Sequence, residues 1–414
     1  MADAPRTHAG GRRARLLALC ALTPAIVHAQ QAPACTAHAP RLFSSEYYAA
    51  PVAVVTLDDA VLVLGTPAYH FSPAGQGGVK ADTSIAGVIR DAAGKVTPIP
   101  RPPGSLAFVH PRALRRPDGD VIVVWSEPDV SRGGTDDGVP QRLMSGTLRG
   151  ASWHAVASLG TVEPGARLMR EVASDLVRVQ GVTYLAFTPE RTGTRPEIEI
   201  LSDSGGRWRR HRFAFELSVI GAVELGESDG RLQLLFAAIP RAASSDRPVT
   251  VGTSLWTSRL LAAGLSAPIK VAGDGNHAIG SPRLLHGTAG TIASWIRDTP
   301  EGPVLEWRAL GSSGEAGPVH RLPDARVAVQ GQAPLRDLIG VVRASGEGQP
   351  RGEVLRLRRD GFELLTGIPL EASLPPVAFG APSVAGVLGV ASVPTPDPGP
   401  FRLVAYDLRC ALRR

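Results

Sequence analysis

The sequence predicts an all-β protein with the architecture of a β-propeller, and three observations predict it. The 414 residues include 46 glycines and 36 prolines, and their apolar runs are short and bounded by turn residues. A hairpin-like unit recurs seven times at intervals of about 50–60 residues. Most copies are followed by two further strand-like runs, and repeats of four short strands at this period are typical of propeller blades.

The first 29 residues are expected to form a signal peptide that is not part of the fold. Three arginines between positions 12 and 15 precede an apolar run from Leu16 to Val27, which is too short to span a bilayer. Val27 and Ala29 place small residues at the −3 and −1 positions of a cleavage site. We therefore expect a secreted or periplasmic protein with a single propeller domain over residues 30–414.

The first two strands of each repeat are expected to form its inner hairpin. The segment from Gly280 to Trp295 (GSPRLLHGTAGTIASW) has a proline near the start, a glycine-rich turn and a second apolar run. Proline lacks the N–H group that a sheet ladder uses, so it fits the start of a strand. The seven predicted hairpins begin near Pro51, Pro111, Val172, Val219, Pro282, Pro334 and Pro382.

The last repeat lacks a fourth strand, because the chain stops just after Cys410. The segment from Arg41 to Tyr48 can supply that strand by pairing antiparallel with the segment from Phe401 to Leu408. This pairing would bring Cys35 near Cys410, and a pair of cysteines in an exported protein predicts a disulfide. A lipid-modified Cys35 is the alternative. The main prediction is a ring of seven four-stranded blades closed in this way, and six blades is the alternative.

One turn between a third and a fourth strand carries a motif. In LSDSGGRW, Asp203 is followed by Gly205 and then by Trp208. This resembles the Asp-box of sialidase-like, BNR-repeat β-propellers, although Leu201 replaces its first serine. The resemblance implies a structural role, in which the Asp203 carboxylate caps backbone N–H groups and Trp208 packs between blades.

The resemblance does not extend to the catalytic residues of sialidases. The segment Val109–Arg112 (VHPR) aligns with the Arg-Ile-Pro motif of those enzymes but has no arginine two residues before its proline. None of the five tyrosines can be assigned as the nucleophile. The sequence therefore favours a non-catalytic member, and a sialidase-like glycoside hydrolase or lyase is the alternative. Glu127 and Asp129 are the acid pair nearest in sequence for such a reaction.

Other patterns that suggest chemistry have simpler explanations. Gly226–Gly230 (GESDG) matches a nucleophile elbow, but a strand rather than a helix follows it, which indicates a hairpin turn. Thr135–Gly138 (TDDG) lacks the spacing of an EF-hand calcium loop. We expect no metal site and no cofactor. The formal charge of +6 is dispersed, so we expect no nucleic-acid partner. No later run is apolar enough to cross a membrane, and we expect a monomer.

Binding residues are expected on the loops that follow the second strands and near the mouth of the central channel, because loops on a rigid scaffold collect function. Their mixed charges suit a polar ligand, an extracellular glycan or protein. We therefore predict an exported binding or scaffold protein that recognises such a ligand on the channel face. The candidate ligand-binding residues are Arg112, Glu127, Asp129, Glu190, Arg191, Arg241, Arg283, Arg297 and Asp298.

Overall fold

The structure is a computed structural model of the chain, and the predicted signal peptide lies outside the residues it describes. Those residues are 35–37, 41–67, 69–71, 79–81, 85–91, 93–129, 141–162, 174–189, 196–204, 207–240, 253–273, 277, 279–287, 290–330, 337–343, 351–358, 361–369, 377–380, 387–394 and 401–410.

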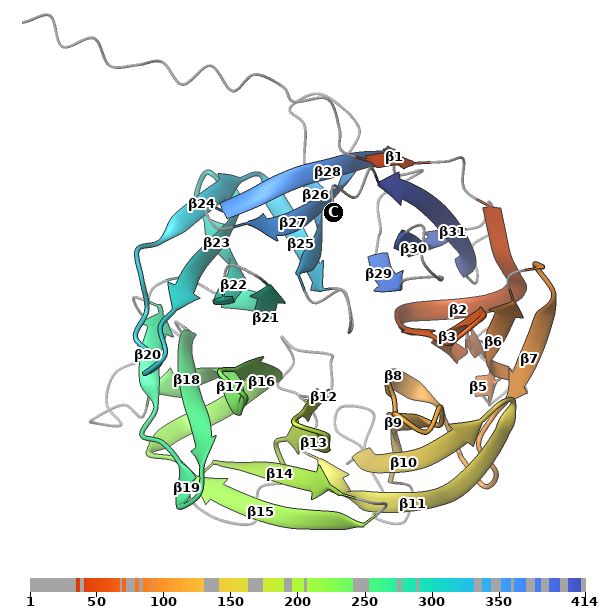
Figure 1. The fold of residues 1–414 in the computed structure, drawn as a ribbon, viewed down its shortest axis with the longest axis horizontal. Helices are drawn as coiled ribbons and strands as arrows, with labels where there is room; N and C mark the ends of the chain where they lie inside the picture. Colours follow the sequence, from red (N-terminus) through yellow and green to blue (C-terminus); the bar gives the residue numbers. More distant parts are fainter. Residues whose placement is uncertain are drawn as a thin grey trace, which may run out of the picture. The chain divides into compact units, whose positions relative to one another are not determined.

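The described residues form antiparallel sheets that follow one another around an axis as the blades of a β-propeller (Figure 1). Five of the sheets have four or five strands and follow in chain order. The first two consist of β8 (Val109–Arg115), β9 (Val121–Pro128), β10 (Gln141–Arg149) and β11 (Ser152–Val162), and of β12 (Ser174–Val179), β13 (Val182–Phe187), β14 (Glu197–Asp203) and β15 (Trp208–Ala214). The third consists of β16 (Leu217–Ser228), β17 (Arg231–Pro240), β18 (Ser254–Leu261), β19 (Gly264–Leu265) and β20 (Ile269–Ala272). The last two consist of β21 (Ile279–Gly287), β22 (Gly290–Thr299), β23 (Gly302–Leu310) and β24 (His320–Pro323), and of β25 (Ala325–Gln330), β26 (Leu338–Arg343), β27 (Arg351–Arg358) and β28 (Gly361–Pro369).

A sixth sheet joins the two ends of the chain and has eight strands. Its strands are β29 (Val377–Gly380), β30 (Val387–Pro394), β31 (Phe401–Cys410), β2 (Arg41–Thr56), β3 (Ala60–Pro67), β6 (Ile85–Asp91) and β7 (Val96–Pro100), with β1 (Cys35–Ala37) paired to β31. A small hairpin of β4 (Tyr69–Phe71) and β5 (Val79–Ala81) stands apart from it.

The long strand β2 closes the ring. Its first part pairs antiparallel with β31, as predicted, and its last part pairs with β3 after a register shift between Ala49 and Val52. β1 continues the pairing along β31 and places Cys35 opposite Cys410. The side chains of both cysteines lie outside the described part of the structure, so the disulfide stays a prediction.

The strand pairing shows that the prediction of seven separate blades is wrong. The described strands form six sheets of four or more strands, which is the number given as the alternative. The physical reason is the length of β2. Because β2 pairs with both β31 and β3, the strands expected for the first and the last blade belong to one eight-stranded sheet, which contributes both β29 and β2 to the inner side of the ring.

Apolar side chains between adjacent sheets form the cores. One cluster joins β2, β3 and β6 to the β8–β11 sheet around Trp125, which is fully buried. The Trp125 ring lies 5.4 Å from that of Phe108 and 5.5 Å from that of Trp153, measured between centroids. Four similar clusters join the next pairs of sheets as far as β25–β28. Each sheet therefore buries its faces against its neighbours.

Three third strands carry a buried glutamate. Glu199 on β14, Glu306 on β23 and Glu353 on β27 are each at most 4% exposed. Each carboxylate faces two or more arginines at 2.9–3.6 Å, at least one of them on the same strand or on a strand paired with it. A buried carboxylate is tolerated only with such partners. The recurrence of this arrangement indicates a structural element of the repeat.

The close approach of β3 and β6 predicts different effects for two glycine substitutions. A Cβ atom at Gly87 would lie 2.3 Å from the Val63 carbonyl oxygen, whereas a Cβ atom at Gly280 would meet no atom within 4 Å. We expect Gly87→Ala to lower the free energy of unfolding by about 2–3 kcal/mol and Gly280→Ala to change it by about 0.5 kcal/mol or less. Thermal unfolding of both variants beside the wild type tests this, and equal melting temperatures for the two would contradict it.

Candidate functional site

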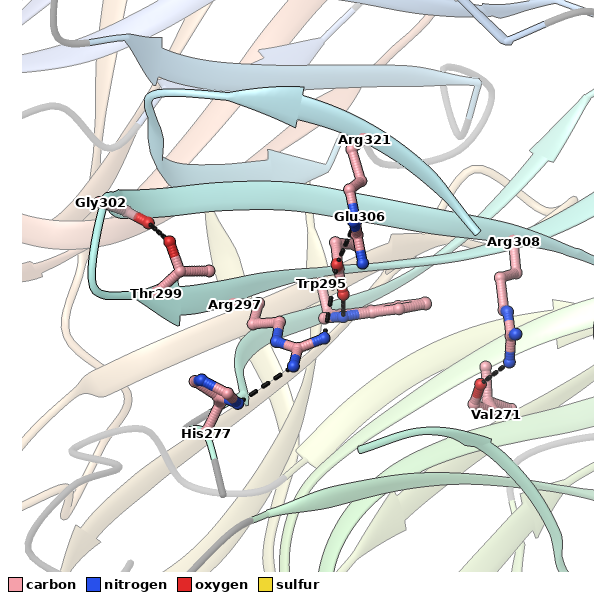
Figure 2. A network of polar contacts seen from close by, with 9 residues as sticks. All are labelled: Val271, His277, Trp295, Arg297, Thr299, Gly302, Glu306, Arg308 and Arg321. Atoms are coloured by element: carbon pink, nitrogen blue, oxygen red, sulfur yellow. Dashed lines mark hydrogen bonds and ion pairs between the residues drawn. The ribbon is translucent and has the colours of Figure 1, made fainter. Parts of the chain in front are cut away.

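A cavity of about 380 Å³ lies between the β16–β20 sheet and the β21–β24 sheet. The segment from Lys270 to Gly273 forms one wall, and residues of β22 and β23 form the other. The lining residues are Lys270, Val271, Ala272, Gly273, Trp295, Arg297, Glu306, Arg308 and Val319. Figure 2 shows most of its polar members from close by.

The strand period explains why these side chains meet. Trp295 and Arg297 are two residues apart on β22, and Glu306 and Arg308 are two apart on β23, so each pair projects from one face of its strand. Trp295 is the cross-strand partner of Glu306, so the two pairs share a face of the sheet. Glu306 is also opposite Arg321 on β24.

Glu306 is the hub of the polar network in Figure 2. Its Oε2 accepts a hydrogen bond from Trp295 Nε1 at 2.9 Å, and its Oε1 accepts one from Arg321 Nε at 2.9 Å. Arg297 Nη1 lies 3.6 Å from the same Oε1. Both carboxylate oxygens are therefore engaged, and the residue is only 3% exposed. These contacts hold Glu306 in one position.

Arg297 also reaches His277, which precedes β21. Arg297 Nη2 lies 3.0 Å from His277 Nδ1. A guanidinium group can only donate, so Nδ1 must be the acceptor and the ring proton must be on Nε2. Arg297 therefore links the imidazole to the Glu306 carboxylate (Figure 2).

Arg308 differs from the other two arginines of this network. Its Nη1 donates to the Val271 carbonyl oxygen at 2.5 Å, and its buried Nε has no hydrogen-bond partner among the described residues. No carboxylate in the described part of the chain forms an ion pair with it, whereas Arg297 and Arg321 both contact Glu306. A positioned guanidinium without an acid can form charge-assisted hydrogen bonds with an anionic ligand, which makes this position a candidate for binding.

The charges of the lining are unequal. Lys270, Arg297 and Arg308 are cationic, and Glu306 is the one carboxylate among the described lining residues. Arg297 and Arg321 already contact that carboxylate. The charges of Lys270 and Arg308 are therefore not neutralised by it, and the cavity has a net positive charge. Such a site attracts anionic groups.

The predicted ligand residues are spread over several sheets, and Arg297 is the described member that lines this cavity. Asp298 follows it on β22 but is exposed on the other face of the strand. Arg112 and Arg283 lie on the inner strands β8 and β21. Arg283 Nη1 forms an ion pair of 2.7 Å with Glu224 of β16, which joins two neighbouring inner strands. Glu190, Arg191 and Arg241 lie outside the described residues, so the structure does not place them.

The acid pair considered for catalysis is buried. Glu127 is 1% exposed and accepts hydrogen bonds from Ser105 Oγ, Leu106 N and Arg142 Nη2 at 2.8–3.1 Å. Asp129 is also buried. The contacts of Glu127 favour a structural role at the end of β9.

The Asp-box segment lies where two sheets meet. Asp203 is buried and pairs with Arg116, which follows β8 in the preceding sheet. Trp208 packs against a cluster formed by the β8–β11 and β12–β15 sheets. Gly205 lies outside the described residues. The assignment of the segment as an Asp-box stays a prediction.

Two further patterns can be compared with the structure. Gly226–Gly230 forms the end of β16 and the turn into β17, with positive φ at Asp229 and Gly230, so the predicted hairpin turn is confirmed. Thr135–Gly138 lies outside the described residues. Within the described residues, no group of three or more His, Cys, Asp and Glu side chains is arranged to hold a metal ion. The same residues include no helix with the length and apolarity needed to cross a membrane.

The sequence analysis missed Lys270, His277, Glu306 and Arg308. It searched loops, whereas Glu306 and Arg308 lie within a strand. Their signal was the run VLEWRAL, in which charged residues alternate with Leu305 and Trp307. That pattern gives one polar and one apolar face, but it does not show that the polar face meets β20.

No protein-family model matches the chain, and no curated protein matches its sequence. Several solved structures resemble it. An ulvan lyase, described as a new family of polysaccharide lyase and bound to -[GlcA(1-4)Rha3S]-, has a TM-score of 0.54 at 10% identity, over 88% of this chain and 95% of that one. The polysaccharide lyase Uly1 has a TM-score of 0.52 at 11% identity, over 94% of both chains.

A neuraminidase-like protein of subtype N11, from the influenza virus A/flat-faced bat/Peru/033/2010, is also similar. Its TM-score is 0.43 at 8% identity, over 74% of this chain and 92% of that one, which is too low to support an argument. At identities this low, the two lyases support the β-propeller fold alone.

The buried network predicts that Glu306 matters more for stability than its exposed partner. We expect Glu306→Gln to lower the free energy of unfolding by about 2 kcal/mol, because Arg297 loses its carboxylate and Trp295 its charged acceptor. Arg321→Gln is the control, with an expected loss of about 0.5 kcal/mol, because the Arg321 side chain is 65% exposed. Urea unfolding followed by tryptophan fluorescence measures both, and equal losses would show that the carboxylate does not organise the network.

Proposed function

We propose that this protein is an exported β-propeller that binds an acidic polysaccharide through the cavity between the β16–β20 and β21–β24 sheets. The observation that carries the proposal is the positive charge that Lys270 and Arg308 leave in the lining. No described acid pairs with either residue, and a carboxylate or sulfate group of a ligand would supply the missing partner. The N-terminal sequence pattern supports export.

The cavity is prepared for such a ligand in two further respects. The Val271 carbonyl holds the Arg308 guanidinium in place, and a charge that is already positioned loses less conformational freedom on binding. Val319 in the lining is 37% exposed, and Val271 and Ala272 add further apolar residues to it. Apolar surface next to a few fixed polar groups suits a sugar ring, which has C–H faces as well as polar substituents.

The fold comparison supports the same ligand class by analogy alone. The ulvan lyase structure holds a repeat of glucuronic acid and sulfated rhamnose. A propeller of similar architecture can therefore accommodate a polysaccharide that carries carboxylate and sulfate groups. At 10% identity the likeness itself shows the fold, and the ligand class is part of the proposal.

The cavity does not favour the hydrolase alternative. A glycoside hydrolase uses two carboxyl groups on either side of the scissile bond. The described lining has one, Glu306, and its oxygens already accept bonds from Trp295 and Arg321. Binding is therefore the function that these residues support best.

Arg308 provides the test. We expect Arg308→Ala to weaken binding of a glucuronate- and sulfate-containing polysaccharide about tenfold or more, because a charge-assisted contact contributes about 1.5–3 kcal/mol. Isothermal titration calorimetry of the mature protein measures the affinity, with dextran as the uncharged polymer. Higher salt should weaken binding to the wild type.

The matched control is Arg231→Ala, which removes the same charge from an exposed residue at the β16–β17 turn. Equal affinities of Arg308→Ala and Arg231→Ala would contradict the proposed cavity. Equal binding of dextran and the acidic polymer would contradict the proposed ligand class. Release of unsaturated oligosaccharides from the acidic polymer would instead identify a lyase.

A further inference from the structure

A second cavity, of about 390 Å³, lies between the β8–β11 and β12–β15 sheets. Arg116 and Asp120 border it from the turn that joins a first and a second strand, and Trp208 borders it just after the turn into a fourth strand. The first cavity lies between two other sheets, β16–β20 and β21–β24. The two cavities therefore share neither a lining residue nor a sheet.

Trp208 forms one wall of this second cavity. It packs against the core between the two sheets and also lines the cavity, so the indole is fixed by its apolar contacts. Asp203, at the end of the preceding strand, holds Arg116 of the neighbouring sheet in place. The motif that the sequence analysis singled out thus supplies part of a cavity wall as well as a contact between sheets.

The charges of the second cavity are balanced, in contrast to those of the first. Arg149 Nε and Nη2 donate to the two oxygens of Asp120 at 3.0 and 2.8 Å, a bidentate pair. These hydrogen bonds lower the pKa of the Asp120 carboxyl, and the nearby positive charge of Arg149 lowers it further. Arg116 is neutralised by Asp203. The lining therefore offers polar groups without a net charge.

Three polar side chains of the lining form no hydrogen bond within the described part of the chain, although the His154 imidazole is close enough to Asp120 to interact with its charge. Among the described residues, the side chains of Thr147, His154 and Trp208 form no hydrogen bond, although all three border the cavity. They offer a hydroxyl, an imidazole and an indole N–H group. A ligand with several hydroxyl groups could satisfy all three at once.

A local irregularity in the sheet shapes this cavity. The register of β10 and β11 shifts between Ser145 and Thr147, so two residues of β11, Ala155 and Val156, stand opposite Gly146. Ala155 has φ of +51°, in the left-handed region that alanine rarely adopts. Bulges of this kind redirect side chains, and strained backbone is found disproportionately at binding sites.

From these observations we infer that the second cavity is a binding site for an uncharged sugar ring. The ring stacks on Trp208, because the indole face is apolar and rigid. Its hydroxyl groups bond to Thr147, His154 and the Asp120–Arg149 pair, which can donate and accept without favouring a charged ligand. This inference concerns other residues and other sheets, so it does not depend on the proposed function.

The experiment titrates the mature protein with the methyl pyranosides of glucose, galactose, mannose and rhamnose, and follows binding by saturation-transfer NMR. We expect at least one of them to bind. Thr147→Val keeps the side-chain shape and removes the hydroxyl, and should weaken that binding about three- to tenfold. Trp208→Ala should abolish it. The control is Thr161→Val, the same change on β11 outside the cavity lining.

If none of the four pyranosides shows saturation transfer from the protein, the inference is overturned. Unchanged affinity of the Thr147→Val variant would also overturn the inference. This variant tests the inference even if Trp208→Ala fails to fold. Methyl glucuronide is titrated in the same way as the charged comparison. If it binds more strongly than the neutral sugars and is equally sensitive to Thr147→Val, the inference is also overturned, because the ligand would then be charged. The result with Arg308→Ala and the acidic polymer is independent of all these outcomes.

Discussion

The pairing of β2 with β31 is the interaction on which the rest of the structure depends. Each sheet buries its faces against neighbouring sheets, so an open ring would leave two apolar faces and two sheet edges exposed to water. The first part of β2 removes the edge of β31, and its last part starts the next set of strands. One strand, β2, therefore pairs with strands from both ends of the chain, and its Ala53 and Val55 also enter the cluster shared with the β8–β11 sheet.

Within that frame, the polar residues divide into two groups. The third-strand glutamates Glu199, Glu306 and Glu353 are buried and paired with arginines, so their charges are satisfied within the protein. Arg308 and Lys270 lie beside one of these glutamates without a partner of their own. The Glu306 arrangement thus differs from the other two in having a cavity beside it, which two further cations line.

The architecture was predictable from the sequence because it depends on local patterns. The turns at Gly226–Gly230 and the pairing of the N-terminal strand with β31 follow from strand spacing. The number of sheets was not predictable from strand spacing, because a strand that pairs along both of its edges joins two expected blades into one sheet. The site was predicted only at Arg297, which lies near the end of a second strand. Lys270 and Glu306 come from different sheets. Their proximity depends on packing between the sheets, which the pattern of a single sequence does not show.

The two cavities also show why charge balance says more about function here than the presence of acids does. Glu127 and Glu306 could each be taken for a catalytic carboxylate, yet both are almost fully buried and accept bonds from several donors. A substrate oxygen could approach either only by displacing those donors, which would leave buried polar groups without partners. Unpaired groups face the cavities instead: cations at Lys270 and Arg308, and uncharged donors and acceptors around Trp208. This distribution favours two binding surfaces of different selectivity on one rigid ring.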